Sequence, residues 1–504
     1  MSHLKPVDMN EYNRTGCLPD TRSDVIKVII DWIADASSEH VLWLYGLAGS
    51  GKSTLSTTIA WMMRDLQRLG GFFFFDRDIP ERSAAKLVTM LSYQLAMFDA
   101  RIGVEVSRIV EAIPNIAEMP LEFQFATLLS VNALRSVEWT RGSIIIVVDA
   151  IDESGSETDR KVLMQALSKG LSGLPSFIRI MVVSRQEPDI QRVLGSHLHV
   201  RPYPLDIDSA GNTGDVLQFL RHRLEKIRVE DEFLGTDWPS DDKINALADR
   251  ARGLFIWAST ACLYIESHDP DKRLCELIDQ RSESNSSGSF AQLDSLYKTG
   301  LQSGGLWNDP SFSSDCCSIL GAMLCARIPL SYSVMDALLM LPQHRPSRKS
   351  ISRLTCVLRI SESEGIRILH PSFHDYLSKR CGGEQWSIDL DLHNKELALR
   401  CINLLDKELR ENICDMTLPY LFQKKPLPEA ISYACKFWIE HTCQISDATD
   451  DIIDRIYNFL VNHLVHWMEV LALLKCHDHI IRFTQNLTKW LRVCHPIHIM
   501  GSCC

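Results

Sequence analysis

The stretch that decides the fold is Gly46-Leu47-Ala48-Gly49-Ser50-Gly51-Lys52-Ser53. It follows the apolar run 41–45, which predicts a buried strand, and it precedes a helical pattern over residues 54–64. A strand, a glycine-rich turn ending in Lys-Ser and a helix together form the setting of a phosphate-binding loop. The alternative is a glycine-rich strand-to-helix turn that binds nothing.

Each residue type in this turn suits a phosphate group. Glycine lets backbone N–H groups wrap around phosphate oxygens without a Cβ clash, and the helix N-terminus adds partial positive charge. Lys52 supplies a full positive charge for the β- and γ-phosphates, and the Ser53 hydroxyl is suited to ligate Mg²⁺. The motif therefore predicts nucleotide contacts from Gly46, Ala48, Gly49, Ser50, Gly51, Lys52, Ser53 and Thr54.

A second motif lies downstream, at residues 144–153. Its β-branched run predicts a fully buried strand, and acidic residues directly after such a strand face ligands at the carboxyl edge of the sheet. We expect Asp149 to hold Mg²⁺, directly or through water. Asp152 or Glu153 is expected to orient or deprotonate an attacking water. Together with the phosphate loop, this pattern is typical of a Walker B element.

Three further apolar runs predict strands at residues 71–76, 178–183 and 198–203. Because these strands alternate with helical patterns, we predict an α/β fold with a parallel, five-stranded, doubly wound sheet. Arg185 follows the run 178–183 and is expected to reach the γ-phosphate, since arginine matches phosphate geometry. The alternative for Arg185 is an ion pair with a surface carboxylate.

Beyond about residue 205 the strand pattern fades, and helices are predicted at 215–227 and 242–265. The run 253–258 is apolar at nearly every position, so we expect it to be buried against the nucleotide domain. Helices followed by a hairpin over 357–369 favour a winged-helix unit. The predicted domains are an N-terminal segment and helix (1–38), a P-loop NTPase domain (39–205), a helical domain (206–280), a polar linker (281–292), a winged-helix domain (293–382) and an all-helical C-terminal domain (383–504).

Composition narrows the classes of partner. The chain has 504 residues and a net charge of −11, which argues against a nucleic-acid surface. Because no run of 18 or more apolar residues occurs, we expect no membrane partner. The 16 cysteines include no Cys-x-x-Cys pair, and no secretory signal opens the sequence, so we expect free thiols in the cytoplasm.

The motifs together resemble the NACHT-type signal-transduction ATPases of the STAND class. The resemblance is greatest to the fungal NOD-like receptor group with a nephrocystin-like NTPase domain. The segments that carry it, in order, are 46–53, 149–153, 184–185 and 369–377. The stretches 17–22, 253–258 and 293–297 are similar to that group as well.

This resemblance implies a switch in which the NTPase, helical and winged-helix domains close over ADP, and exchange for ATP permits oligomerisation. It also implies that His370 contacts the β-phosphate of ADP and that Thr21 and Arg22 lie on the adenine side. On the residues alone, one histidine after an apolar strand is more often a hydrogen-bonded structural residue than a ligand. Receptors of this kind usually carry an N-terminal effector module and C-terminal sensor repeats, and we identify neither in this sequence.

The function predicted first is an ATP- and ADP-binding signal-transduction switch with slow Mg²⁺-dependent hydrolysis. It would form a homo-oligomer in the ATP state and act on a protein partner that the sequence does not identify. The alternative is a nucleotide-stabilised interaction scaffold without effective hydrolysis. A P-loop small-molecule kinase is disfavoured by the long helical C-terminal half, and an ABC-type ATPase by the lack of a Leu-Ser-Gly-Gly-Gln signature.

Overall fold

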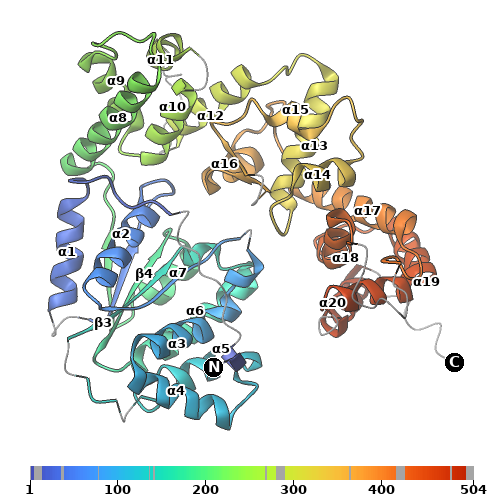
Figure 1. Cartoon of the computed structure of the whole chain (residues 1–504), viewed down its shortest axis with the longest axis horizontal. Coiled ribbons are helices and arrows are strands. Elements are labelled where there is room, and N and C mark those ends of the chain that lie inside the picture. Colours follow the sequence, from blue (N-terminus) through green and yellow to red (C-terminus); the bar gives the residue numbers. More distant parts are fainter. Residues whose placement is uncertain are drawn as a thin grey trace. The chain divides into compact units, whose positions relative to one another are not determined.

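The structure is a computed structural model of the chain. It describes residues 2–4, 14–35, 39–77, 79–134, 137–139, 142–266, 269–279, 290–361, 365–415, 426–476 and 480–494. The chain divides into two compact units, residues 1–296 and 297–504, and each is considered by itself (Figure 1). The predicted linker lies outside the described residues as far as residue 289, and the finer division into six segments stays a prediction.

The first unit is built on a five-stranded, all-parallel sheet, which confirms the predicted fold class. Its strands run in the order β2-β3-β4-β1-β5. They are β1 (Val41–Tyr45), β2 (Leu69–Phe74), β3 (Ile144–Asp149), β4 (Ile178–Ser184) and β5 (Val200–Pro204). Because β4 lies between β1 and β3, the residues that follow these three strands meet at one edge of the sheet.

Helices cover both faces of this sheet, since alternate side chains of a strand point to opposite faces. Leu42 and Leu44 pack in one core with the helices α1 (Ser23–Ala34) and α2 (Lys52–Asp65). Val41 and Trp43 belong to the core on the other face. The helices on that face are α3 (Leu87–Phe98), α4 (Ala100–Ala112), α5 (Leu121–Leu128), α6 (Glu157–Gly170) and α7 (Pro188–Leu194) (Figure 1). The sheet is therefore doubly wound.

Four helices complete the first unit up to residue 279. They are α8 (Ala210–Glu230), α9 (Asp241–Ala251), α10 (Phe255–Glu266) and α11 (Pro270–Asp279). The sequence pattern predicted one helix over 242–265, but the chain breaks it at Arg252 and Gly253, whose φ angles are 43° and 73°. A Cβ on Gly253 would lie 2.0 Å from the carbonyl oxygen of Ile207, so the break needs glycine.

The second unit begins with helices and a hairpin. The helices are α12 (Ala291–Gly304), which leads into the unit, α13 (Pro310–Cys325), α14 (Tyr332–Leu339) and α15 (Ser347–Ile351). The strands β6 (Leu358–Ser361) and β7 (Gly365–Ile368) then pair antiparallel, with Leu358 opposite Ile368. This is the hairpin expected from the sequence, and the short helix α16 (Pro371–Asp375) follows it. The winged-helix assignment itself remains a prediction.

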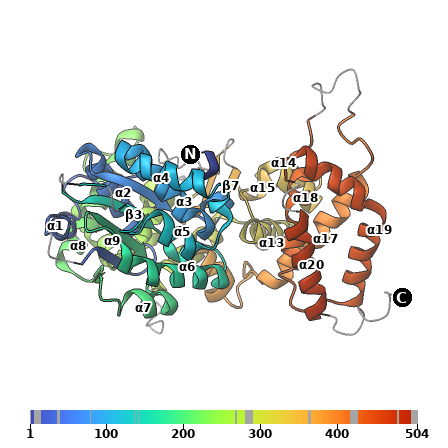
Figure 2. The ribbon, with the colours of Figure 1, turned by 90° about the horizontal axis from the view of Figure 1, so that it is seen from below.

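In the last part of the second unit, the described secondary-structure elements from residue 390 on are all helices. The helices α17 (Leu390–Glu408), α18 (Glu429–Thr442), α19 (Asp450–Leu473) and α20 (Ile480–Cys494) lie side by side (Figure 2). The ring of Trp438 packs at 5.3 Å from that of Phe459 and 5.7 Å from that of Trp467, which joins α18 to α19. None of the described helices is both long enough and apolar enough to cross a membrane.

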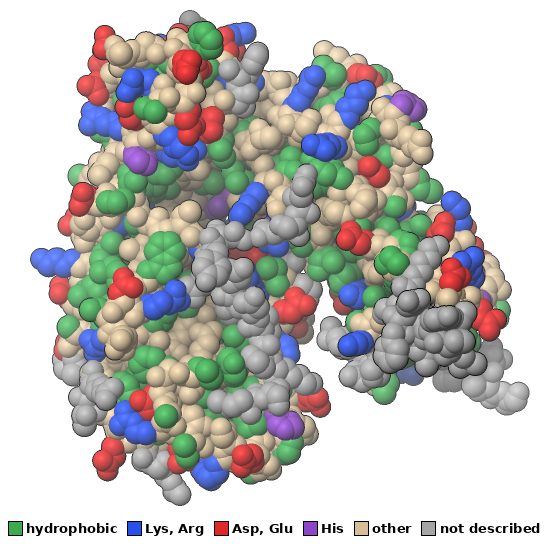
Figure 3. Space-filling model, in the orientation of Figure 1, with side chains coloured by type: hydrophobic (Ala, Val, Ile, Leu, Met, Phe, Trp, Pro, Cys, Tyr) green, Lys and Arg blue, Asp and Glu red, His purple; other side chains and the backbone are tan. Residues whose placement is uncertain are grey.

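Charged side chains of both signs are scattered over the face of the molecule shown in Figure 3. On the face shown in Figure 3, acidic and basic groups are interspersed in each unit. This mixing follows from the near balance of 53 basic and 64 acidic residues in the sequence. Such a surface lacks the single-sign field that attracts a polyanion from a distance.

Candidate nucleotide-binding site

The glycine-rich turn has the backbone of a phosphate-binding loop. It connects the end of β1 to α2, which begins at Lys52. Gly49 and Gly51 have φ angles of 76° and 88°, in the left-handed region that favours glycine. Gly51 is the N-cap of the 14-residue helix α2 and has no side chain that could accept hydrogen bonds from the first turn. The backbone N–H groups of that turn are therefore suited to bind an anion.

Lys52 is bent back onto its own loop. Its Nζ donates hydrogen bonds to the carbonyl oxygens of Gly46 at 2.9 Å and Leu47 at 2.7 Å. Burial lowers the pKa of Lys52 to about 8, although the negative charge of Asp152 opposes this shift. A phosphate group would compete with the two carbonyls for the ammonium and raise its pKa again. The Lys52 ammonium therefore lies against the loop, and its contact with a phosphate stays a prediction.

Asp149 ends β3 beside the first turn of α2. Its carboxylate is buried, and Oδ2 accepts a hydrogen bond from Nη2 of Arg14. The same nitrogen lies 3.3 Å from the carbonyl oxygen of Ser53, so Asp149 and Ser53 adjoin. Among the described residues, Asp149 Oδ1 has no hydrogen-bond partner. An orphaned buried carboxylate oxygen near a serine at the start of a helix fits the oxygen ligands that Mg²⁺ prefers.

The chain turns sharply after Asp149. Ala150 adopts a left-handed conformation with φ at 58°, and a single 3₁₀ turn over Ile151–Glu153 follows. Asp152 is buried, and its Oδ1 accepts a hydrogen bond from the backbone N–H of Arg185 at 3.0 Å. Its Oδ2 forms an ion pair with Nε of Arg185 at 3.1 Å. Arg185 is thus paired with a buried carboxylate of the site, and not with a surface carboxylate as the alternative proposed. Its contact with a γ-phosphate stays a prediction.

Glu153 has an unusual protonation state. Burial of its carboxyl raises the pKa to about 8, and the neighbouring Asp152 raises it further, while Arg77 and Arg185 act against the shift. The carboxyl itself lies deep in the site, although the residue as a whole keeps partial solvent exposure. Burial therefore favours the neutral form of the Glu153 carboxyl, whereas the charged form is the one that accepts a proton from water.

Glu153→Gln is expected to remove the loss of folding stability that wild type shows as the pH rises. The pKa of Glu153 rises from 4.5 to about 8 on folding, so the folded chain holds an extra proton between these values. The free energy of unfolding therefore falls as the pH rises through this window. In urea denaturation, the stability advantage of the variant over wild type should widen from pH 5 to pH 8.5. Glu157→Gln, at an exposed residue of α6, is the control, and an advantage that stays constant with pH would contradict the assignment.

Helix α10 packs directly on the phosphate loop. The backbone N–H of Ile256 donates to the carbonyl oxygen of Gly49 at 3.0 Å. A Cβ on Gly49 would lie 1.9 Å from Cγ2 of Ile256, so the two segments are in close contact. The apolar run 253–258 is therefore buried against the nucleotide domain, as predicted from its composition.

Arg22 contacts the phosphate loop and the helices α8 and α10. Its guanidinium donates to the carbonyl oxygen of Ser50 in the loop and lies 4.7 Å from the ring centre of Phe255 in α10. Its backbone N–H donates to the carboxylate of Asp215 in α8 at 3.1 Å. Burial lowers the pKa of Arg22. The structure thus brings Arg22 to the loop predicted to bind phosphate.

Two other predicted site residues have local partners. Thr21 donates its hydroxyl to the carbonyl oxygen of Leu18 at 2.6 Å, within its own turn. His370 lies in the second unit, where its Nδ1 accepts the backbone N–H of Ser372 at 3.1 Å and caps α16. Contact of Thr21 with adenine and of His370 with ADP remain predictions.

Two arginines of the site were not singled out by the sequence analysis. Arg14 contacts Asp149 from a polar, irregular stretch with no motif around it. Arg77 follows Asp76 just beyond the end of β2, and its charge acts on Glu153. The rule that ligands bind at the carboxyl ends of parallel strands, applied to the strand predicted at 71–76, would have found Arg77.

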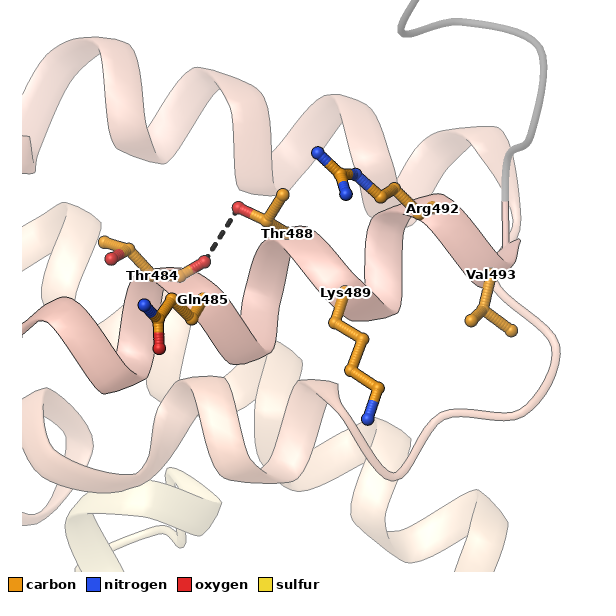
Figure 4. Close-up of a pocket in the computed structure, with 6 residues that line it drawn as sticks. All are labelled: Thr484, Gln485, Thr488, Lys489, Arg492 and Val493. Atoms are coloured by element: carbon orange, nitrogen blue, oxygen red, sulfur yellow. Dashed lines mark hydrogen bonds between the residues drawn. The ribbon is translucent and has the colours of Figure 1, made fainter.

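A pocket of about 440 Å³ lies elsewhere, along α20 in the second unit (Figure 4). Its lining comes from one helix, and Lys489 and Arg492 point in opposite directions in the figure. The lining residues include no carboxylate that could hold a metal ion. They are Thr484, Gln485, Thr488, Lys489, Arg492 and Val493. This pocket therefore lacks the chemistry of the site on the sheet.

Comparison with protein families decides the class of the first domain. Residues 26–185 match the family model described as nephrocystin 3, N-terminal. This is a NACHT-like P-loop NTPase domain. The match spans the phosphate loop, the acidic edge at Asp149 and Arg185, and four of the five strands of the NTPase domain. It confirms the predicted nephrocystin-like, NACHT-type P-loop NTPase domain for this part of the chain, and the NOD-like receptor group stays a prediction.

Wider comparisons were made with curated proteins and with solved structures. No curated protein matches the sequence. Among solved structures, the chain is similar to a Signal Transduction ATPase with Numerous Domains (STAND) protein with a tetratricopeptide repeat sensor from Pyrococcus horikoshii. The TM-score is 0.44 and the sequence identity 12%, over 96% of this chain and 59% of that one. The chain thus spans 59% of the length of that protein.

Proposed function

We propose that this chain is a nucleotide-dependent signalling switch that binds ATP or ADP with Mg²⁺ at its phosphate loop. The observation that carries the proposal is the contact between α10 and that loop, through the Ile256 N–H and the Gly49 carbonyl. A loop that adjusts to phosphate would move its partner helix, because close-packed segments transmit displacement. An enzyme that only turned over substrate would not need this coupling.

Each part of the NTPase machinery then has a role. Lys52 binds the β- and γ-phosphates, and Ser53 and Asp149 hold Mg²⁺, which neutralises charge on the phosphate oxygens. Arg185 must leave Asp152 to reach the γ-phosphate, and Glu153 must lose its proton before it can activate water. These two requirements support slow hydrolysis.

The scaffold alternative has one observation in its favour, the protonated state of Glu153. Phosphate release by purified protein with Mg²⁺·ATP separates the two functions. A switch should release phosphate slowly, and Glu153→Gln should lower the rate by the 10²–10⁴-fold typical of general acid–base catalysis. ATP binding without phosphate release above the Lys52→Ala background would favour the scaffold.

Closure over ADP is proposed from the family resemblance. His370→Ala is expected to release ADP that the protein retains on purification, because it removes the imidazole proposed to face the β-phosphate. That change also deletes the N-cap of α16, so His370→Asn is the matched control, since asparagine is a good capping residue. Both variants should lose ADP, measured by chromatography after denaturation, while His370→Asn keeps wild-type thermal stability. Equal ADP retention in all three proteins would exclude this role.

Oligomerisation in the ATP state is part of the same proposal. Light scattering with ADP and with a non-hydrolysable ATP analogue tests it on the full chain. A larger mass with the analogue alone supports the proposal, and the same mass in both states counts against it. The interspersed surface charge supports a protein partner over a nucleic acid.

A further inference from the structure

We propose that Arg14 is an internal cation that neutralises Asp149 through Oδ2 and is displaced when Mg²⁺ and nucleotide bind. The inference rests on the proposed function, because it assumes that Asp149 holds Mg²⁺. It adds a residue to the site and gives that residue a role in setting the affinity for the metal.

The contacts of Arg14 place its guanidinium between the two proposed metal-binding residues. Its Nη2 donates to Oδ2 of Asp149 and to the carbonyl oxygen of Ser53, the latter at 3.3 Å. Its Nε donates to the hydroxyl of Thr57 at 2.9 Å, one turn further along α2. One nitrogen therefore contacts both residues that would ligate Mg²⁺, through Oδ2 of Asp149 and the backbone carbonyl of Ser53.

The guanidinium is also held from its other side. Its central carbon lies 4.4 Å from the ring centre of Phe74 and 5.4 Å from that of Phe72, both in β2. Such cation–aromatic contacts favour a fixed position for the charge. With 17% of its side chain exposed, Arg14 is built into the site and is not a surface arginine in passing contact.

Competition with Mg²⁺ follows from the electrostatics. A buried carboxylate needs a compensating cation, and Arg14 supplies one to Asp149. A divalent ion on the same carboxylate would repel the guanidinium at a distance of a few ångströms. The free energy needed to move Arg14 is then subtracted from the free energy of metal binding.

Displacement of Arg14 would shift a segment of the chain that contacts α2. The backbone N–H of Cys17 donates to the hydroxyl of Thr58 at 2.7 Å. Gly16 packs against Trp61 so closely that a Cβ on Gly16 would lie 2.8 Å from the Trp61 ring. The segment that carries Arg14 thus runs beside α2 before it reaches Arg22 at the phosphate loop. Metal occupancy would in this way be transmitted to the chain ahead of α1.

Arg14→Gln tests the proposal on the full chain. Titration of Mg²⁺ into ADP-saturated protein, followed by calorimetry, should give about tenfold or tighter metal affinity in the variant, from the usual strength of a charged hydrogen bond. In thermal unfolding without Mg²⁺, the variant should melt below wild type, because Asp149 loses its partner. With saturating Mg²⁺ and ADP, the difference in melting temperature should disappear.

Arg82→Gln is the matched control. The Arg82 guanidinium also lies over Phe74, at 4.1 Å, but it faces Asp76 at 3.7 Å instead of Asp149. The Mg²⁺ affinity of the Arg82→Gln variant should stay at the wild-type value. Unchanged or weaker Mg²⁺ affinity in Arg14→Gln, or equal tightening in both variants, would overturn the proposal.

A purely structural role for Arg14 would lower the melting temperature with and without ligand and leave the Mg²⁺ affinity unchanged, which also overturns it. If Arg14→Gln does not fold, Arg14→Lys takes its place, since lysine keeps the charge but makes fewer directed hydrogen bonds. It should bind Mg²⁺ more tightly than wild type, and unchanged affinity would contradict the proposal. If wild type binds no ADP, the proposed function fails; if ADP binds and only the metal result is negative, this inference alone fails.

Discussion

Lys52→Ala is expected to weaken ATP and ADP binding by roughly 30-fold to a few thousand-fold, the range for truncating one partner of a desolvated charge pair. The ammonium is a full positive charge at the loop, and its present partners, the carbonyls of Gly46 and Leu47, bring no charge of their own. Calorimetry at pH 7 with each nucleotide measures the loss. Lys27→Ala, at an exposed residue of α1, is the control.

The pH dependence sharpens this test. Because the pKa of Lys52 is lowered to about 8 in the free protein, its charge is present at pH 7 and is lost as the pH rises past that value. Nucleotide binding above pH 8 must first return the proton to Lys52, so the difference in affinity between wild type and variant should narrow there. Equal affinities at pH 7 would remove Lys52 from the site and with it the proposed function.

Gly49→Ala is expected to lower the free energy of unfolding by about 2–5 kcal/mol, the sum of left-handed strain and overpacking. The residue has a φ of 76°, and the new methyl group would meet the Ile256 side chain at 1.9 Å. Either the loop or α10 must shift, so the contact proposed to couple nucleotide to the helical segment should be lost. Urea denaturation measures the stability, and calorimetry the remaining ADP affinity.

The double variant Gly49→Ala/Ile256→Ala separates the two costs. Truncating Ile256 removes Cγ2, at 1.9 Å, but keeps Cβ, at 2.6 Å, so it relieves part of the clash and none of the strain. The two changes should therefore be less damaging together than their sum, by about 0.5–3 kcal/mol. Gly214→Ala is the matched control, since no heavy atom lies within 4 Å of its added Cβ in α8. It should be neutral or slightly stabilising. If Gly49→Ala is tolerated equally well, α10 does not pack on the loop as described.

The sheet and its acidic edge could be predicted because their signals are local. The β-branched run before Asp149 specifies a buried strand wherever it lies, and Lys52 follows a motif whose backbone needs only its own glycines. The parallel order then brings Asp149, Asp152 and Arg185 to one edge without further information. Sequence periodicity and the carboxyl-edge rule were sufficient for this part of the site.

The contacts that cross the fold could not be read in this way. Arg14 reaches Asp149 across 135 positions of sequence, and nothing around it marks it as different from other arginines. The helix break at Gly253 was hidden by continuous apolar periodicity, because the reason for the glycine is a carbonyl oxygen of Ile207. Both features depend on a neighbour that is distant in sequence, which a pattern in one stretch does not contain.

The protonated carboxyl of Glu153 has a consequence for the energetics of the resting protein. Any ligand that brings positive charge to this edge of the sheet would drive that proton into solution, and the heat absorbed or released would depend on the buffer that receives it. Alkaline conditions would then favour the charged, ligand-bound form. The first domain would in this respect sense the acidity of its surroundings as well as its ligand.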